Sequence, residues 1–210
     1  MPAGMTRIPP SANFIVFTLG SPTNETGRFA DEGPQTDVTL TSPFWIGRHE
    51  VTQQEYQSVV SNNPSFFSGD PNRPVEMVTY AEATNYCAKL TLRDRQTGLI
   101  PAGYGYRLPT EAEWECAARA DSSMRFSFGD DETQLNNYAW QADNSSNTTH
   151  PVETKLPNAW GLYDMYGNAY EWCQDWYGPY PGGVMSNPQG PATGQYRVIR
   201  GGAYNNTSAR

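Results

Sequence analysis

Short apolar runs separated by turn residues dominate the first fifty positions of the chain. Residues 14–19, 38–41 and 44–47 are rich in β-branched and aromatic side chains and are bounded by Gly, Ser or Pro, which predicts three β-strands. The stretch 24–34 is polar and contains glycine, which predicts a loop. The opening third is therefore expected to consist of strands and turns.

Three helices are predicted by one repeated signal, the capping box. In this motif a Thr side chain accepts from the third helical amide, and the Glu at that position reaches back to the amide of the Thr. The pairs are Thr52 with Glu55, Thr79 with Glu82, and Thr110 with Glu113. Apolar residues then follow at helical spacing: Tyr56, Val59 and Val60; Ala83, Tyr86, Cys87 and Leu90; and Trp114, Ala117 and Ala118.

The pattern changes after Arg119, where Gly, Pro, Asn and aromatic residues alternate without helical periodicity. Only residues 196–200 predict a further strand. A long irregular stretch inside a compact domain is typical of a functional or metal-braced segment. We therefore predict an α+β fold with little regular secondary structure and a loop-rich second half.

Composition narrows the classes of partner and compartment. The chain has 210 residues, of which 13% are aromatic and 17% charged, with a net charge of −8. This acidic balance disfavours nucleic acid, and no apolar run is long enough to span a membrane. The first residues lack the layout of a signal peptide, so a cytoplasmic location is the default expectation. The three cysteines are expected to be isolated buried thiols.

Five sequence blocks, taken in order, carry a family resemblance. They are RHEVT (48–52), RPVEMVTYAEATNYC (73–87), YRLPTEAEWE (106–115), NAWGLYDMYGNAYEW (158–172) and RVIRGGAY (197–204). Together they resemble the formylglycine-generating enzyme family, also called the sulfatase-modifying factor family. The resemblance implies a single domain over residues 1–210, of the C-type-lectin-like kind and with bound structural calcium. It also implies a closing C-terminal strand, which is absent from these 210 residues.

The oxidase chemistry of that family depends on two cysteine thiolates that hold copper. Thiolates are the ligands that select Cu(I). The resemblance implies a Gly-Gly-Ser motif followed by the first of these cysteines. Here Ala203 stands at the serine position and Asn206 at the cysteine position, and the chain ends one residue before the second cysteine position. We therefore expect neither copper nor a catalytic residue in this chain.

Other catalytic chemistries find little support in the sequence. A two-His-one-carboxylate iron site needs two suitably placed histidines, and the chain has only His49 and His150. Both are interpreted as surface or hydrogen-bonded side chains. The chain also lacks the Gly-x-Ser-x-Gly turn of a Ser-His-Asp hydrolase.

The segment 164–171 is a candidate calcium loop, because two carboxylates, Asp164 and Glu171, flank Gly167. Calcium takes carboxylate and carbonyl oxygens together. The resemblance assigns it the side chains of Asp164 and Glu171 and the carbonyls of Gly167 and Ala169. A second calcium site would use Asn137, the carbonyl of Tyr138, and Asn144. The alternative for this second set is that these residues form Asx turns.

The C-terminal segment is the candidate binding cleft, formed by Trp172, Tyr204, Asn205, Asn206 and Ser208. Tyr, Ser and Asn make adaptable binding surfaces at low cost in conformational entropy. The segment resembles that of retroelement-diversified, lectin-like binding proteins, whose variable positions follow a similar motif. We therefore predict a calcium-braced module that binds a protein or peptide. The alternative functions are an ordinary polar loop, or a formylglycine-generating oxidase whose catalytic cysteines lie beyond residue 210.

Overall fold

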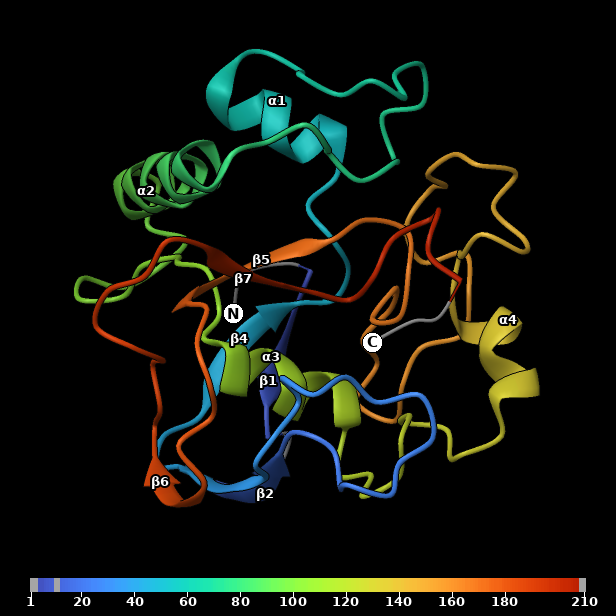
Figure 1. The fold of residues 1–210 in the computed structure, drawn as a ribbon. Coiled ribbons are helices and arrows are strands. Elements are labelled where there is room, and N and C mark those ends of the chain that lie inside the picture. Colours follow the sequence, from blue (N-terminus) through green and yellow to red (C-terminus); the bar gives the residue numbers. More distant parts are fainter. Residues whose placement is uncertain (1–3, 10–11, 208–210) are drawn as a thin grey trace.

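The computed structural model describes residues 4–9 and 12–207, and Figure 1 shows its elements in order. The strands are β1 (Met5–Ile8), β2 (Ile15–Leu19), β3 (Thr36–Leu40), β4 (Phe44–Gly47), β5 (Glu171–Trp176), β6 (Gly183–Ser186) and β7 (Arg197–Arg200). The helices are α1 (Gln53–Val60), α2 (Tyr80–Gln96), α3 (Glu111–Arg119) and α4 (Leu135–Tyr138), with a short 3₁₀ turn, η1 (Glu132–Gln134), before α4. The predicted α+β class is confirmed.

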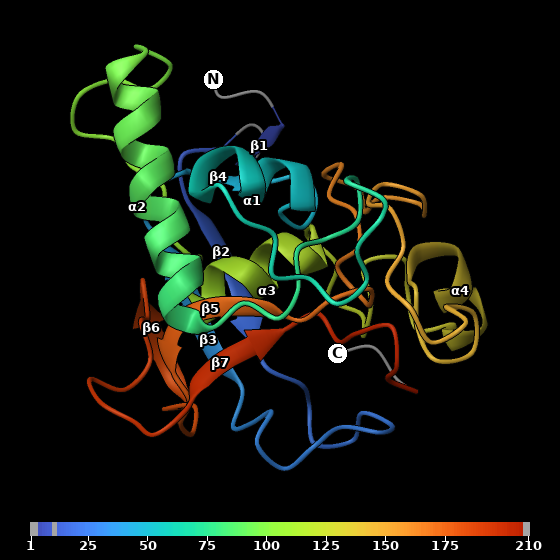
Figure 2. The ribbon, with the colours of Figure 1, turned by 90° about the horizontal axis from the view of Figure 1, so that it is seen from above.

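The strands form three small sheets. β1 pairs antiparallel with β4, and β5 pairs antiparallel with β7, with Glu171 opposite Arg200. In the third sheet β3 lies between β2 and β6, antiparallel to the first and parallel to the second. The two views in Figures 1 and 2 show β5 and β7 above α3, with α1 and α2 on the outer side of that sheet.

The three predicted helix starts are confirmed, each with a complete capping box. Thr52, Thr79 and Thr110 have extended backbones and accept from the third helical amide, while the Glu at that position bonds back to the cap amide. Each box satisfies two backbone N–H groups that a helix N-terminus would leave unpaired. The sequence signal therefore fixed these three starts locally.

Helix α3 forms the centre of the hydrophobic core. Seven of its nine residues are buried, and Trp114 is only 2% exposed. Val38 of β3, Cys173 of β5 and Val198 of β7 belong to the same cluster. Helix α3 thus packs against β2, β5 and β7, and it ends before Ala120, which has a left-handed conformation.

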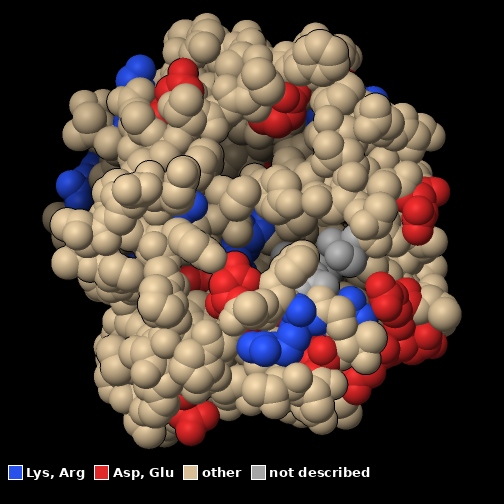
Figure 3. Space-filling view, viewed as in Figure 1, with Lys and Arg blue, Asp and Glu red and all other residues tan. Residues whose placement is uncertain are grey.

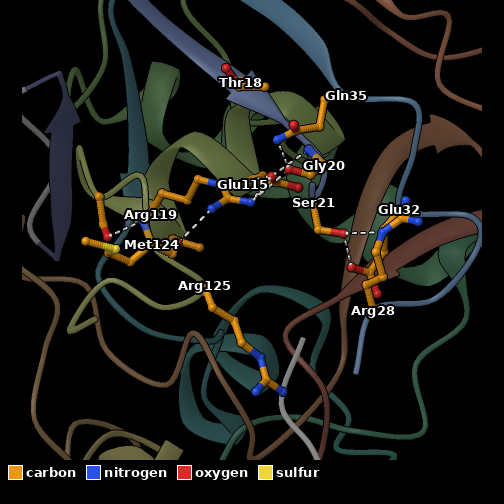
Figure 4. Close-up of polar contacts among 12 residues, drawn as sticks. Thr18, Gly20, Ser21, Arg28, Glu32, Gln35, Glu115, Arg119, Met124 and Arg125 are labelled. Atoms are coloured by element: carbon orange, nitrogen blue, oxygen red, sulfur yellow. Dashed lines mark hydrogen bonds and ion pairs between the residues drawn. The ribbon is translucent and has the colours of Figure 1, made fainter. Parts of the chain in front are cut away.

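One buried carboxylate, that of Glu115, links three elements, and Figure 4 shows its contacts with Gly20 and Arg119. It accepts from the Gly20 amide at 2.9 Å, from Arg119 Nε at 2.9 Å and from Arg200 at 2.6 Å. Gly20 follows β2, and Arg200 ends β7, so the carboxylate links both to α3. These residues line a cleft of about 510 Å³, whose lining includes none of residues 201–207.

The second half of the chain contains strands that the sequence analysis missed. In β5 the inward positions are Cys173 and Asp175, and Asp175 accepts from the Glu111 amide at 2.9 Å. A buried carboxylate breaks the usual apolar alternation, so the pattern concealed the strand. All four residues of β6 are exposed, so it has no alternation to detect. No helix in the described part of the chain is long and apolar enough to cross a bilayer.

Candidate functional site

The segment that contains the predicted calcium loop runs beside the Trp140 backbone. Asn168 donates its amide proton to the Trp140 carbonyl at 2.8 Å. A Cβ at Gly167 would overlap that same carbonyl oxygen, so only glycine allows this close approach. Asp164 and Asn168 have positive φ angles of 60° and 65°, a conformation that Asp and Asn tolerate better than most residues. The residue types at positions 164, 167 and 168 therefore suit the backbone conformation of this turn.

Asn168 is fully buried and joins the loop to three distant segments. Its Oδ1 accepts from the His150 amide at 2.8 Å, and its Nδ2 donates to Glu50 Oε2 at 2.8 Å. Its carbonyl accepts from the Tyr204 amide at 2.9 Å. The predicted calcium loop and the C-terminal segment therefore meet at one residue.

Three carboxylates around this loop lie close enough for their negative charges to repel one another. Glu50 is buried, and its two oxygens accept from Asn168 and from the Ala169 amide at 2.7 Å. Burial, reinforced by the negative charges of Asp164 and Glu171, raises the pKa of Glu50 well above its ordinary range. Burial also raises the pKa of Asp164 to about 6 and that of Glu171 to about 7. The site is therefore short of positive charge.

The donor set suits a hard cation. Asp164 is 1% exposed, and its Oδ1 is buried with no hydrogen-bond partner in the described structure. A Cβ at Gly201 would lie 3.7 Å from Glu171 Oε1 and 3.8 Å from the Ala169 carbonyl oxygen, so both oxygens are on the same side of Gly201. Among the described residues no three His, Cys, Asp or Glu side chains gather closely enough to hold a metal ion. A cation here would therefore need carbonyl and water oxygens as well, which is how calcium binds.

The residues of the predicted second calcium site are engaged with their own loop. Asn144 Oδ1 accepts from the Gln141 amide at 2.8 Å, and its Nδ2 donates to the Ala139 carbonyl at 2.9 Å. The Asn137 carbonyl accepts from the Leu156 amide, and its side chain donates to Gln134. These contacts are those expected of loop-forming Asx residues. The second site, which would also use the Tyr138 carbonyl, stays a prediction.

The C-terminal segment forms a turn that is held by hydrogen bonds from the loop at residues 142–145. The Tyr204 carbonyl accepts from Ser145 Oγ at 2.7 Å, and the Asn206 carbonyl accepts from the Ala142 amide at 2.9 Å. Asn205 is exposed, whereas Asn206 Oδ1 is buried without a hydrogen-bond partner in the described structure. Trp172 is half-buried and donates to the Val78 carbonyl at 2.9 Å. Ser208 lies outside the described residues.

The positions relevant to copper chemistry hold no sulfur. Ala203 is buried, and Asn206 follows in the turn. The cysteines Cys87, Cys116 and Cys173 are free thiols elsewhere in the fold. Burial raises the pKa of Cys87 to about 11 and of Cys116 to about 12, and raises that of Cys173 well above its ordinary range. These thiols are therefore held protonated, whereas a metal ligand must be a thiolate.

Two histidine interpretations are confirmed by contacts. His49 Nδ1 lies 2.7 Å from the Glu50 carbonyl, and His150 Nε2 lies 2.7 Å from the Ser145 carbonyl. His150 also stacks on Trp140 at 3.7 Å between ring centroids. Both rings serve the packing of the loops around the site.

Glu50 and Asn168 are site residues that the sequence analysis did not select. Asn168 follows Gly167 within residues 158–172, and a Gly-Asn pair is typical of a turn, so the sequence did indicate a special backbone position there. Glu50 lies more than a hundred positions before the loop that it braces, and no local pattern connects the two.

Comparisons with known proteins agree with this architecture. Residues 6–210 match the family described as the sulfatase-modifying factor enzyme 1-like domain. The chain is 31% identical to the chaperone protein LppX of Paenibacillus barcinonensis, over 80% of this chain and 71% of that protein. It is 34% identical to the formylglycine-generating enzyme of Streptomyces coelicolor, over 81% of this chain and about half (54%) of that enzyme.

A solved structure with a similar fold is Treponema denticola variable protein 1. It superposes with a TM-score of 0.83 at 33% identity, over 97% of this chain and 84% of that protein.

Proposed function

Because this chain belongs to the family of sulfatase-modifying factor enzyme 1-like domains, we propose that it is a calcium-braced module that binds a protein or peptide through its C-terminal turn, without thiol oxidation. Family membership alone does not decide between oxidation and binding, because function depends on the residues of the site. The proposal therefore depends on what stands at each position of the turn.

The observation that carries the proposal is Asn206. An amide cannot act as the soft, redox-active ligand that Cu(I) requires. The same amide places hydrogen-bonding groups where sulfur would stand; its Oδ1 is buried without a partner within the described structure, so contact with a ligand falls to the exposed residue beside it. Tyr204 and the exposed Asn205 flank it and add adaptable hydrogen-bonding groups.

Calcium would be held by the carboxylates of Asp164 and Glu171 and by the carbonyls of Gly167 and Ala169. When bound, it supplies positive charge to a group of buried carboxylates. Glu50 holds this loop through the Ala169 amide and Asn168, and Asn168 in turn binds the Tyr204 amide. Ordering the loop would therefore also order the turn that presents Asn205 and Asn206.

The Treponema variable protein supports the same interpretation. That protein is called a variable protein. In this chain, the C-terminal segment resembles that of lectin-like, retroelement-diversified binding proteins. A binding surface of changeable polar residues on a rigid scaffold fits both the fold and the composition of residues 203–207.

The proposal is tested with a displayed library of short random peptides selected on the calcium-loaded protein. Selected peptides should bind the wild type and lose affinity for the Asn205→Ala and Asn206→Ala variants, and also lose affinity in EDTA. Asn24→Ala, in the loop between β2 and β3, is the matched control and should bind normally. Peptides that bind all variants equally, with and without EDTA, would refute the proposal.

A second candidate is the sulfatase-modifying oxidase itself, favoured by the 34% identity to the Streptomyces enzyme. It would require catalytic thiolates that residues 1–210 do not place at the family's positions.

A further inference from the structure

The backbone of Tyr204 is held at both of its polar groups, from two different loops. Its amide donates to the Asn168 carbonyl at 2.9 Å, and its carbonyl accepts from Ser145 Oγ at 2.7 Å. Its ring also meets the Phe67 ring edge to face, with 5.1 Å between the centroids. Because the peptide group is planar, a carbonyl that is held in this way also fixes the direction in which the chain enters the exposed Asn205.

The hydroxyl of Ser145, which holds this carbonyl, has both of its roles filled. It donates to Tyr204 and accepts from the Asn147 amide at 3.1 Å. The Ser145 amide donates to the Gln141 carbonyl at 2.9 Å, which fixes the backbone that carries the side chain. Ser145 is completely buried, so it cannot touch a ligand itself. It acts on the turn only through the hydrogen bond to Tyr204.

Ser145 and Tyr204 belong to a closed ring of four hydrogen bonds that includes the predicted calcium loop. Two of the four are the bonds to the Tyr204 backbone. In the third, the His150 amide donates to Asn168 Oδ1 at 2.8 Å. In the fourth, His150 Nε2 lies 2.7 Å from the Ser145 carbonyl and must donate to it, because a carbonyl only accepts. Displacing any one member of the ring therefore strains its bonds to both neighbours.

The surroundings of the turn make the position of its backbone decisive. Figures 1 and 2 place the C-terminal segment on the side of the molecule that carries α4. Figure 3 shows the face of Figure 1 as a solid surface, which is hollowed below α1 and consists mostly of uncharged side chains. Residues 201–207 likewise contain no charged side chain. Recognition by such a turn depends on the direction of its hydrogen-bonding groups, because hydrogen bonds weaken steeply when they are misaligned.

We propose that Ser145 is a positioning residue of the binding turn, and that the ring through Asn168 and His150 makes the order of the turn depend on calcium. This rests on the proposed function, in which calcium orders the loop that contains Asn168. Order gained there passes directly to the Tyr204 amide, and it reaches the Tyr204 carbonyl by way of His150 and Ser145. The coupling is reciprocal, so a ligand that holds the turn should also raise the affinity for calcium.

The test is amide hydrogen exchange measured by NMR, with calcium alone as the probe. In the wild type, calcium should slow exchange at the Tyr204 amide and at the Asn206 amide, which donates to the Ala203 carbonyl at 3.0 Å inside the turn. In Ser145→Ala, calcium should still slow exchange at Tyr204, but its effect at Asn206 should fall by about tenfold or more. A merely structural loss would instead speed exchange at both amides equally, with or without calcium.

Ser122→Ala is the matched control. Ser122 Oγ donates to the Phe126 carbonyl at 2.9 Å and accepts from the Met124 amide at 3.1 Å, which is the same arrangement in a different loop. Its calcium response at Tyr204 and Asn206 should match that of the wild type. Ser145→Cys, which keeps a weak donor at the same position, gives a second variant and should lie between the wild type and Ser145→Ala.

The outcomes separate this inference from the proposed function. Calcium that slows exchange within residues 164–171 of the wild type but not at Asn206 would overturn the coupling and leave the calcium-braced module intact. A wild-type response at Asn206 in both Ser145 variants would overturn the role of Ser145. Calcium that changes exchange at none of these amides would overturn both the inference and the calcium brace.

Discussion

The three carboxylates around the candidate calcium loop predict an unusual dependence of stability on pH. The pKa of Asp164 is raised from 3.8 to about 6 and that of Glu171 from 4.5 to about 7, in both cases mainly by burial. Between about pH 4 and pH 7 the folded protein therefore binds more protons than the unfolded chain. The free energy of unfolding should fall as pH rises through this window, and level off above it.

The magnitude follows from the size of the pKa differences. Each of the two folded-state pKa values lies a little over two units above its ordinary value, and one unit corresponds to about 1.4 kcal/mol, so each group contributes about 3 kcal/mol. This stabilisation is fully present below about pH 4 and is lost as pH rises through about 6 to 7. Burial of Glu50 adds an effect of the same sign.

Under the proposed function calcium should reverse this dependence, because it would bind the ionised carboxylates and only in the folded state. We expect urea unfolding in EDTA, followed by tryptophan fluorescence, to give lower stability at about pH 8 than at about pH 5. Calcium should restore stability most at the higher pH, and magnesium should not. Asp164→Asn should remove the share of this dependence that Asp164 contributes, about 3 kcal/mol, and should remove the calcium response.

The control for this experiment is Asp131→Asn. Hydrogen bonds from Thr133 lower the pKa of Asp131, so this exposed carboxylate titrates below the window and its loss should leave the profile unchanged. Stability in EDTA that climbs steadily from about pH 5 to about pH 8 would refute the reasoning. So would an Asp164→Asn protein that responds to calcium as the wild type does.

Two further predictions concern buried polar groups and are read from urea or thermal unfolding. Glu115→Ala leaves Arg119 and Arg200 without their shared carboxylate and should cost about 3–5 kcal/mol. Glu132→Ala removes an exposed carboxylate that pairs with Arg125 and should cost less than about 1 kcal/mol. Equal losses would contradict this account of the network. Asn158→Ala removes hydrogen bonds to the Ala117 and Ala118 carbonyls at the end of α3 and should cost about 2–4 kcal/mol, and a neutral result would show that water replaces them.

The sequence predicted elements that local chemistry determines. The capping boxes at Thr52, Thr79 and Thr110 each act within four residues, so they could be recognised without tertiary information. Strand β5 could not, because Asp175 is buried through a contact with the start of α3. Strand β6 forms only because β3 offers it a parallel partner.

The candidate site divides in the same way. Asp164, Gly167 and Glu171 share one short segment and one motif. Glu50 lies more than a hundred positions before that segment, and the aromatic contact between Phe67 and Tyr204 joins residues that are similarly far apart in the sequence. Contacts of this range have no local pattern, and only the folded chain reveals them.

The most direct test of the central claim is mass spectrometry of a cysteine-containing sulfatase peptide after incubation with this protein, Cu(I) and oxygen. The formylglycine-generating enzyme of Streptomyces coelicolor serves as the positive control. We predict that the peptide cysteine stays intact with this chain while the control enzyme converts it. Formation of formylglycine by residues 1–210 alone would contradict the claim that this chain, with Asn206 at the cysteine position, binds a ligand and does not oxidise thiols.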